Sequence, residues 1–178
     1  MDAIIEQFRA RIQSASADGS RLLLRGGGTK DWYGQNVVGD VFDTRPYAGV
    51  VDYEATELVI TARCGTPLAE IEALLAANGQ MLAFEPPRFG AASTIGGVVA
   101  SGLSGPRRAT AGALRDFVLG AQLMDGRGEL LSFGGQVMKN VAGYDVSRLL
   151  AGSLGTLGLI TQVSLGFAGA VSRGDHPF

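Results

Sequence analysis

Three glycine-rich segments contain the residues whose types and spacing could do chemistry. The first reads Arg-Gly-Gly-Gly-Thr-Lys at positions 25–30 and directly follows the apolar run 22–24. Consecutive glycines allow a positive φ and let several backbone N–H groups point at one anion. The segment is therefore suited to a pyrophosphate group, although glycine triplets also occur in plain turns.

The other two segments lie later in the chain. Residues 93–102 place two hydroxyls before a glycine pair and continue with small side chains, which offers N–H and O–H donors to a phosphate. The alternative is a tightly packed helix start. Residues 152–161 carry glycine at every third position from 152 to 158 and lead into an apolar run. This spacing could expose backbone N–H and C=O groups along the aromatic ring system of a ligand. The alternative is a bulged or twisted entry into a strand.

The common nucleotide-binding and catalytic motifs do not account for these segments. No Gly-Lys pair exists, so there is no P-loop, and the triplet lacks the Gly-x-Gly-x-x-Gly spacing of Rossmann enzymes. The one histidine, His176, lies near the C-terminus, and no carboxylate pair has a useful spacing. Cys64, in an apolar run, predicts an inert buried thiol and no metal site. The residues favour a protein that holds a redox cofactor.

Composition narrows the class further. A chain of 178 residues is long enough for one domain. Its net charge of −2, with Lys and Arg spread along the chain, argues against nucleic acid as a partner. No apolar run is long enough to span a membrane, and the first residues lack the pattern of a secretory signal. We therefore expect a cytoplasmic protein without a membrane span.

The apolar periodicity predicts the elements that must position the three segments. Helices are expected at 2–14, between Pro67 and Asn78 with the proline at the first helical position, over 94–101 as a short helix or tight turn, and at 146–151 behind a capping Asp145. Strands are expected at 22–24, 50–53, 58–62, 80–84, 117–124, 130–133 and 157–166. Two pairs of these strands form hairpins, at 50–62 and 117–133. This mixture of antiparallel hairpins and a few helices predicts an α+β fold.

Taken together and in this order, the three segments resemble the FAD-binding fold of the vanillyl-alcohol oxidase, or PCMH, type. Phe-Glu-Pro-Pro at 84–87 and the run 138–149 add a resemblance to the FAD-binding subunits of glycolate oxidases in particular. The resemblance covers about 3–167. It implies a two-lobed domain with mixed and antiparallel sheets flanked by helices, and we expect this domain at 1–167, with a loose tail at 168–178.

The resemblance also assigns roles to residues of this chain. The first two segments would hold the pyrophosphate of FAD, and the backbone of 155–160 would contact the flavin. The residues implied in cofactor binding are Arg25, Gly26, Gly27, Gly28, Thr29, Lys30, Pro87, Ser93, Thr94, Gly96, Gly97, Ser101, Gly102, Gly155, Thr156, Gly158 and Ile160. The implied role is the FAD-binding component of a 2-hydroxy acid (glycolate) oxidase. The implied partners are a second flavoprotein and an iron–sulfur subunit, through which the protein would associate with the inner face of the membrane.

Two departures from the resemblance leave alternatives open. Some proteins of this type bind FAD covalently through a histidine near the glycine loop, whereas His176 lies far from it, so we expect non-covalent FAD. Members of the family continue into a second domain that covers the flavin, whereas the resemblance here ends at Phe167. A non-catalytic FAD-binding module is therefore the alternative to an oxidase component, and we expect little 2-hydroxy acid oxidation by the chain alone. A reductase of cell-wall precursor synthesis with the same fold matches less well.

Several residues near these segments have weaker candidate roles. Lys139 and Asn140 could meet a substrate carboxylate or a partner, although a solvated loop explains the lysine equally. Tyr144 could stack near the ring or pack in a turn. Arg107 and Arg108 more simply pair at the surface than contact phosphates.

The absence of histidine from all three glycine segments predicts that acid denaturation releases the flavin. Protein loaded with FAD and precipitated with acid should leave the yellow colour in the supernatant. Yellow colour that stays with the washed precipitate would contradict non-covalent binding.

Overall fold

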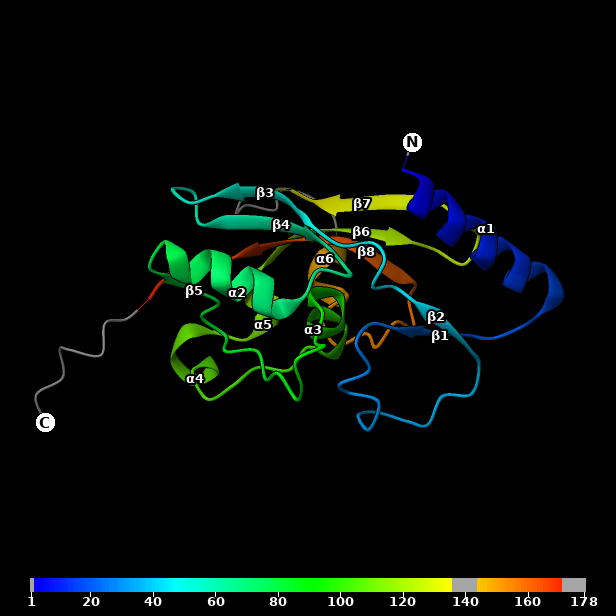
Figure 1. Ribbon diagram of the computed structural model, residues 1–178, viewed down its shortest axis with the longest axis horizontal. Coiled ribbons are helices and arrows are strands. Elements are labelled where there is room, and N and C mark those ends of the chain that lie inside the picture. The colour runs from blue at the N-terminus through cyan, green and yellow to red at the C-terminus, as the bar shows by residue number, and fades with distance from the viewer. Residues whose placement is uncertain (1, 136–143, 171–178) are drawn as a thin grey trace, which may run out of the picture.

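The longest apolar strands assemble into a five-stranded antiparallel sheet (Figure 1). The structure is a computed structural model that describes residues 2–135 and 144–170. The sheet order is β3-β4-β8-β6-β7, so β8 lies between two hairpins. The strands are β3 (Val50–Glu54), β4 (Val59–Arg63), β6 (Val118–Met124), β7 (Leu130–Gly134) and β8 (Leu159–Gly166). Both predicted hairpins are confirmed by this pairing.

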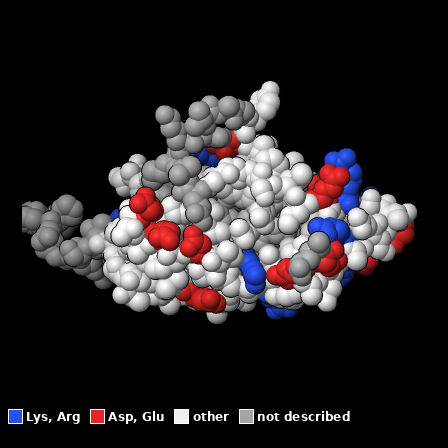
Figure 2. Space-filling view, turned by 90° about the horizontal axis from the view of Figure 1, so that it is seen from above, with Lys and Arg blue, Asp and Glu red and all other residues white. Residues whose placement is uncertain are grey.

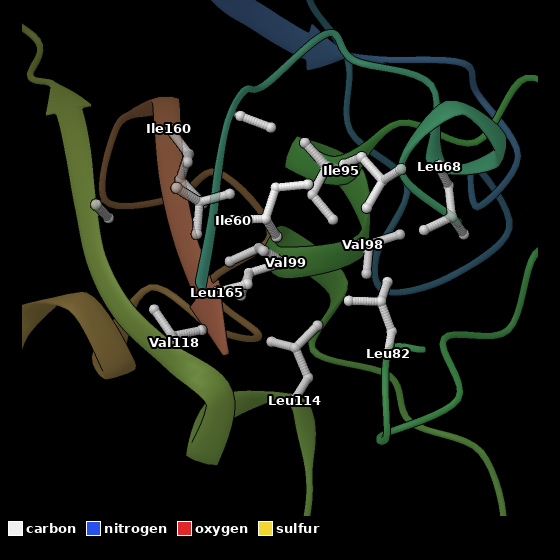
Figure 3. Close-up of a cluster of buried hydrophobic side chains, with 14 of the residues drawn as sticks. Ile60, Leu68, Leu82, Ile95, Val98, Val99, Leu114, Val118, Ile160 and Leu165 are labelled. Atoms are coloured by element: carbon white, nitrogen blue, oxygen red, sulfur yellow. The ribbon is translucent and has the colours of Figure 1, made fainter. Parts of the chain in front are cut away.

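Helices cover one face of this sheet, the lower face in Figure 1. The main core lies between the two layers, where Ile60 and Leu165 of the sheet meet Val98 and Val99 of a helix (Figure 3). Burying such side chains fully contributes about 1.5–3 kcal/mol each. The covering helices are α2 (Leu68–Ala77), α3 (Ile95–Ser101), α4 (Arg108–Ala111), α5 (Leu114–Phe117) and α6 (Val146–Leu149).

A smaller lobe packs against one end of the sheet. It contains α1 (Ala3–Asp18), β1 (Leu22–Arg25) and β2 (Asp40–Asp43), and the two strands pair in parallel. Its core includes Phe8 and Phe42, whose ring centroids lie 4.9 Å apart. Met124 and Leu159 extend from the large sheet into the same cluster. The two lobes therefore share buried side chains, and the α+β, two-lobed fold expected from the sequence is confirmed.

The helix expected at 2–14 runs on to Asp18, the one expected at 146–151 ends at Leu149, and the short helices α4 and α5 were not predicted. Asp2 caps α1, whose C-terminal cap is Gly19 in the left-handed region at φ 73°, and Asp145 caps α6 by accepting from Arg148 N. The start of α2 is corrected by one position, because Pro67 has extended ψ and precedes the first helical residue. Gly79 follows α2 at φ 64°, as expected from the Asn-Gly pair.

Three strand predictions need correction. The strand expected at 80–84 is only β5 (Gln80–Met81), because the chain turns where Glu85 adopts a φ of 48° and its N–H donates to Leu82 O. Residues 82–84 are buried without pairing in a sheet. Phe117 ends α5 and does not begin β6. The strand expected at 157–166 starts only at Leu159, after Gly158 at φ 140°.

The last described residues pair with β5. A two-residue strand β9 (Ala168–Gly169) runs antiparallel to β5, and Ala170 N donates to Gly79 O at 2.7 Å. The first residues of the segment expected to be a loose tail thus contact the main lobe. The remainder, 171–178, lies outside the described residues.

Two surface properties bear on partners. Within the described ranges, no helix combines the length and apolar character needed to cross a membrane. Figure 2 shows acidic and basic side chains dispersed over the face seen from above, with no concentration of basic side chains on that face. A uniform basic field of the kind that attracts nucleic acid is therefore not found on this face.

Cys64, at the end of β4, is predicted to resist thiol reagents in the folded protein. The side chain is 1% exposed, and burial raises the pKa of its thiol to about 12. Only the thiolate is a good nucleophile, so both access and ionisation are suppressed. Labelling with a chromogenic disulfide reagent should be slow in buffer and complete in denaturant. Rapid stoichiometric labelling of folded protein would contradict the predicted inert thiol.

Candidate cofactor site

A cavity of about 710 Å³ lies where the three glycine segments meet. Its volume falls within the range of ordinary small-molecule sites, about 300–1,000 Å³. The predicted residues on its wall are Arg25, Gly26, Gly27, Gly28, Thr29, Lys30, Thr94, Gly96, Gly97, Ser101, Gly155, Thr156, Gly158 and Ile160. Segments far apart in sequence are thus brought together around one space.

Three predicted residues are not part of this wall. Ser93 is buried behind it, where its Oγ accepts a hydrogen bond from Lys30 Nζ at 3.2 Å. Gly102 caps α3 at φ 65°, and a Cβ there would lie 2.8 Å from Gly152 N. Gly102 thus lets the helix end pack against the third segment. Pro87 follows the turn at Glu85 and lies away from the cavity wall.

The glycine triplet follows β1 and approaches the second segment very closely. A Cβ at Gly27 would lie 1.6 Å from Ala92 O, and one at Gly26 would lie 2.4 Å from Thr94 Oγ1. The positive φ expected of the triplet is found only at Gly28, at 68°. Gly26 and Gly27 are therefore needed chiefly for close backbone approach. Substitution of Gly27 would disturb the fold together with the site.

The triplet also presents free hydrogen-bond donors. The backbone N–H groups of Gly26, Gly27 and Gly28 donate to no other residue in the part of the chain that the structure describes. Buried or half-buried N–H groups normally find an acceptor. Three adjacent donors beside a cavity thus fit an anionic ligand with several oxygens, such as a pyrophosphate.

Backbone hydrogen bonds to the turn that follows β4 fix the second segment. Ile95 N donates to Thr66 O and Gly96 N to Cys64 O, both at 2.9 Å. The two glycines that follow Thr94 then differ in their surroundings. A Cβ at Gly96 would lie 2.7 Å from Cys64 Cβ, whereas one at Gly97 would meet only Thr94 Oγ1, at 3.4 Å. Gly97 is thus the glycine that leaves space on the cavity wall without being required by protein packing.

The third segment is tied to the end of α3 and carries backbone strain. Gly152 N donates to Val99 O and Leu154 N to Ala100 O. Leu154 adopts a φ of 53° and is followed by Gly155 at 76°. A left-handed conformation costs a residue with a Cβ roughly 1–2 kcal/mol. The half-exposed Leu154 side chain lines the cavity, so the strain is located at the site.

The charges on the wall leave a single uncompensated cation. Arg25 is paired with Asp31, with NH2 2.6 Å from Oδ2. Lys30 forms no ion pair with any described residue, and its only hydrogen-bond partner among them is Ser93. Burial lowers the pKa of Lys30, because desolvation disfavours the charged amine. An anionic ligand would supply the missing counter-charge.

Sequence reasoning missed a second set of wall residues. Asp31, Tyr33 and Leu154 lie inside or beside the predicted segments, so their position in the chain was a usable signal. Thr44 and Cys64 come from elsewhere in the chain, and only the tertiary structure brings them to the wall.

The weaker candidates do not join the cavity. Lys139 and Asn140 fall outside the described residues. Tyr144 is 97% exposed, so it is neither packed in the core nor on the wall. Arg107 and Arg108 lie at α4, away from the wall. No group of three or more histidine, cysteine, aspartate or glutamate side chains within the described ranges is placed to hold a metal ion.

Comparison with known proteins identifies the domain. Residues 4–134, most of the chain, match the FAD binding domain family. The chain belongs to this family. FAD, which the resemblance implied, is therefore the cofactor of this domain. The N–H groups of the triplet and Lys30, which have no acceptor and no counter-ion among the described residues, fit its pyrophosphate.

Individual relatives agree with this assignment. The chain is 51% identical over 163 residues to the glycolate oxidase subunit GlcE of Escherichia coli, covering 92% of this chain and 45% of that protein. It is 28% identical to a D-lactate dehydrogenase of Archaeoglobus fulgidus, covering 90% and 36%. Alkyldihydroxyacetonephosphate synthase has the same fold, with a TM-score of 0.72 at 24% identity over 95% of this chain and 31% of that one. The chain thus spans less than half the length of these relatives.

Gly97→Ala should weaken FAD binding without weakening the fold. The new methyl group enters the cavity space, while alanine stabilises a helix interior by roughly 0.5–1 kcal/mol relative to glycine. We expect about a tenfold higher dissociation constant, since overpacking typically costs about 1–3 kcal/mol. Fluorescence titration with FAD and thermal unfolding of the apoprotein measure the two effects.

Two glycines provide the controls. Gly126 lies in a turn, and a Cβ there would have no atom within 4 Å. Gly126→Ala should therefore leave the affinity for FAD unchanged. Gly96→Ala should lower the unfolding temperature, because the Cβ meets Cys64. Wild-type affinity in Gly97→Ala would show that the ligand does not approach this part of the wall.

Proposed function

We propose that this domain holds FAD non-covalently as the FAD-binding component of an enzyme that oxidises 2-hydroxy acids such as glycolate. The observation that carries the proposal is the wall of the cavity, where three N–H donors and a lysine lie side by side with no acceptor or counter-ion for them among the described residues. Membership of the FAD binding domain family supports it independently.

In this proposal each part of the wall has a distinct role. The glycine triplet and Lys30 bind the pyrophosphate, with N–H donors for its oxygens and a positive charge for its anion. The second segment completes this side of the site through Thr94 and Gly97. The third segment offers its backbone at Gly155 and Gly158 to the flavin ring system. When bound, FAD supplies the group that accepts a hydride equivalent.

The proposed substrate class is supported by the similar proteins. The names of two relatives specify glycolate and D-lactate, which are both 2-hydroxy acids. The described wall itself offers little for proton abstraction. Its one carboxylate, Asp31, is engaged by Arg25, and its thiol, Cys64, has a raised pKa. These residues are therefore better suited to holding the cofactor than to acting as the general base.

The proposal extends to partners and location. GlcE is named as a subunit of glycolate oxidase, which supports assembly of this domain with further oxidase subunits. We propose a second flavoprotein and an iron–sulfur subunit among them, a cytoplasmic location, and association with the inner face of the membrane through these partners. The alternative is a non-catalytic FAD-binding module.

Reconstitution with FAD tests the proposal directly. The purified chain should take up FAD, seen as a shifted visible flavin spectrum after gel filtration. Anaerobic glycolate or D-lactate should then reduce the bound flavin more slowly than the usual enzymatic range of about 1–1000 per second. Failure to bind FAD would overturn the proposal.

The rate of reduction separates the two roles. Flavin reduction within the enzymatic range by a 2-hydroxy acid would show that residues 1–178 already contain a base. It would exclude the non-catalytic module. Succinate, a carboxylic acid without the hydroxyl group, is the matched control and should not reduce the flavin.

A further inference from the structure

Arg25 and Asp31 form a forked ion pair across the base of the glycine triplet. Arg25 Nε lies 2.9 Å from Asp31 Oδ2 and 3.2 Å from Oδ1, and NH2 lies 2.6 Å from Oδ2. Two nitrogens of the guanidinium group thus donate to Oδ2, and Nε also reaches Oδ1, so the contact fixes orientation as well as distance. The pair therefore joins the end of β1 to the residue directly after Lys30.

The loop between the two partners is folded around the guanidinium group. Gly28 is in the left-handed region, and a Cβ on it would lie 2.1 Å from Arg25 NH2. The Arg25 carbonyl is held as well, since it accepts from Thr44 N at 3.0 Å and from Thr44 Oγ1 at 3.3 Å. Arg25 is thus anchored by its backbone and occupied by Asp31 through its side chain.

We infer that Asp31 is a positioning residue for the cofactor: by holding Arg25 in this fork, it fixes the shape in which the triplet presents its N–H groups to the pyrophosphate. This inference rests on the proposed FAD site and deepens it. Arg25 then holds the loop in shape, and Lys30 supplies the positive charge for the ligand. Asp31 belongs to none of the residues that the family resemblance implies in cofactor binding.

The exposure of the pair separates this role from a general contribution to stability. Both side chains are more than one third exposed, at 38% and 55%. Ion pairs this exposed contribute little to global stability, because solvent screens the charges and the long side chains lose entropy when they are held in one geometry. Breaking the pair should therefore affect the loop far more than the unfolding temperature.

The chain offers a matched control close by. Arg45 and Asp43 form the same kind of fork, with Nε–Oδ1 at 2.9 Å and NH2–Oδ2 at 2.8 Å, and are 58% and 39% exposed. Neither residue lies on the cavity wall. Asp43→Asn thus removes the same charge from a comparable forked pair, near Arg25 but outside the loop.

The first measurement is made on the apoprotein. Trp32, the one tryptophan of the chain, follows Asp31 and donates from Nε1 to Thr29 O at 3.3 Å, so its fluorescence anisotropy reports the loop. Asp31→Asn should lower this anisotropy, and Asp43→Asn should leave it unchanged. Unchanged anisotropy in Asp31→Asn would contradict the proposed role of Asp31 in fixing the loop, whether or not the protein binds FAD.

The second measurement is the dissociation constant of FAD. Asp31→Asn should raise it by about three- to tenfold, and Arg25→Lys should do so too, because lysine keeps the charge but loses the fork. Asp31→Glu should recover part of the affinity by restoring a carboxylate. Asp43→Asn should bind as the wild type does.

The opposite result identifies a different role for Arg25. If Arg25 contacted the pyrophosphate directly, Asp31 would compete with the ligand, and Asp31→Asn would bind FAD as tightly as the wild type or more tightly. That outcome overturns the inference while leaving the proposed function intact. Loss of FAD binding by the wild-type protein would instead contradict the proposed function, and the anisotropy of Trp32 would still decide the role of Asp31.

Discussion

The close approach of two backbones, at Gly27 and Ala92, is the constraint on which the cavity depends. No side chain fits between them, because a Cβ on Gly27 would overlap the Ala92 carbonyl. The second segment is in turn hydrogen-bonded to residues 64–66, which leave β4. The glycine triplet is therefore positioned through the second segment against the large sheet, in addition to the buried cluster that the two lobes share.

This arrangement explains why the glycines are not equivalent. Gly26, Gly27 and Gly96 have neighbours too close for any side chain, so they are required by the fold before any ligand binds. Gly97 has space in front of it, and that space belongs to the cavity. Glycine-rich sequence alone does not distinguish these cases, because the difference lies in which neighbour approaches each Cα. Folding and binding thus make separate demands on adjacent residues.

The sequence predicted those features that local chemistry determines. Apolar periodicity located α1, α2 and both hairpins, and the glycine segments located most of the cavity wall. It failed where tertiary contacts decide. The four residues of β2 contain one buried side chain, Phe42, which packs with side chains of α1 and β1 in one cluster that no local pattern reveals. Residues 82–84 read as a strand because they are apolar, yet they are buried in a turn. Cys64 and Thr44 reach the wall through long-range packing that no local pattern records.

The two cations on the cavity wall, Arg25 and Lys30, lie in different local environments. Arg25 enters the loop at the end of β1, beside the glycine N–H groups on the cavity wall. Its guanidinium group is engaged by Asp31 within the loop, and the hydrogen bond to this carboxylate raises the pKa of Arg25. Lys30 is then left with a neutral hydroxyl as its only partner among the described residues. Burying a cation without a counter-ion costs free energy, and a bound anion offsets that cost. The charges on the wall therefore favour binding of a ligand whose negative charge lies beside the triplet.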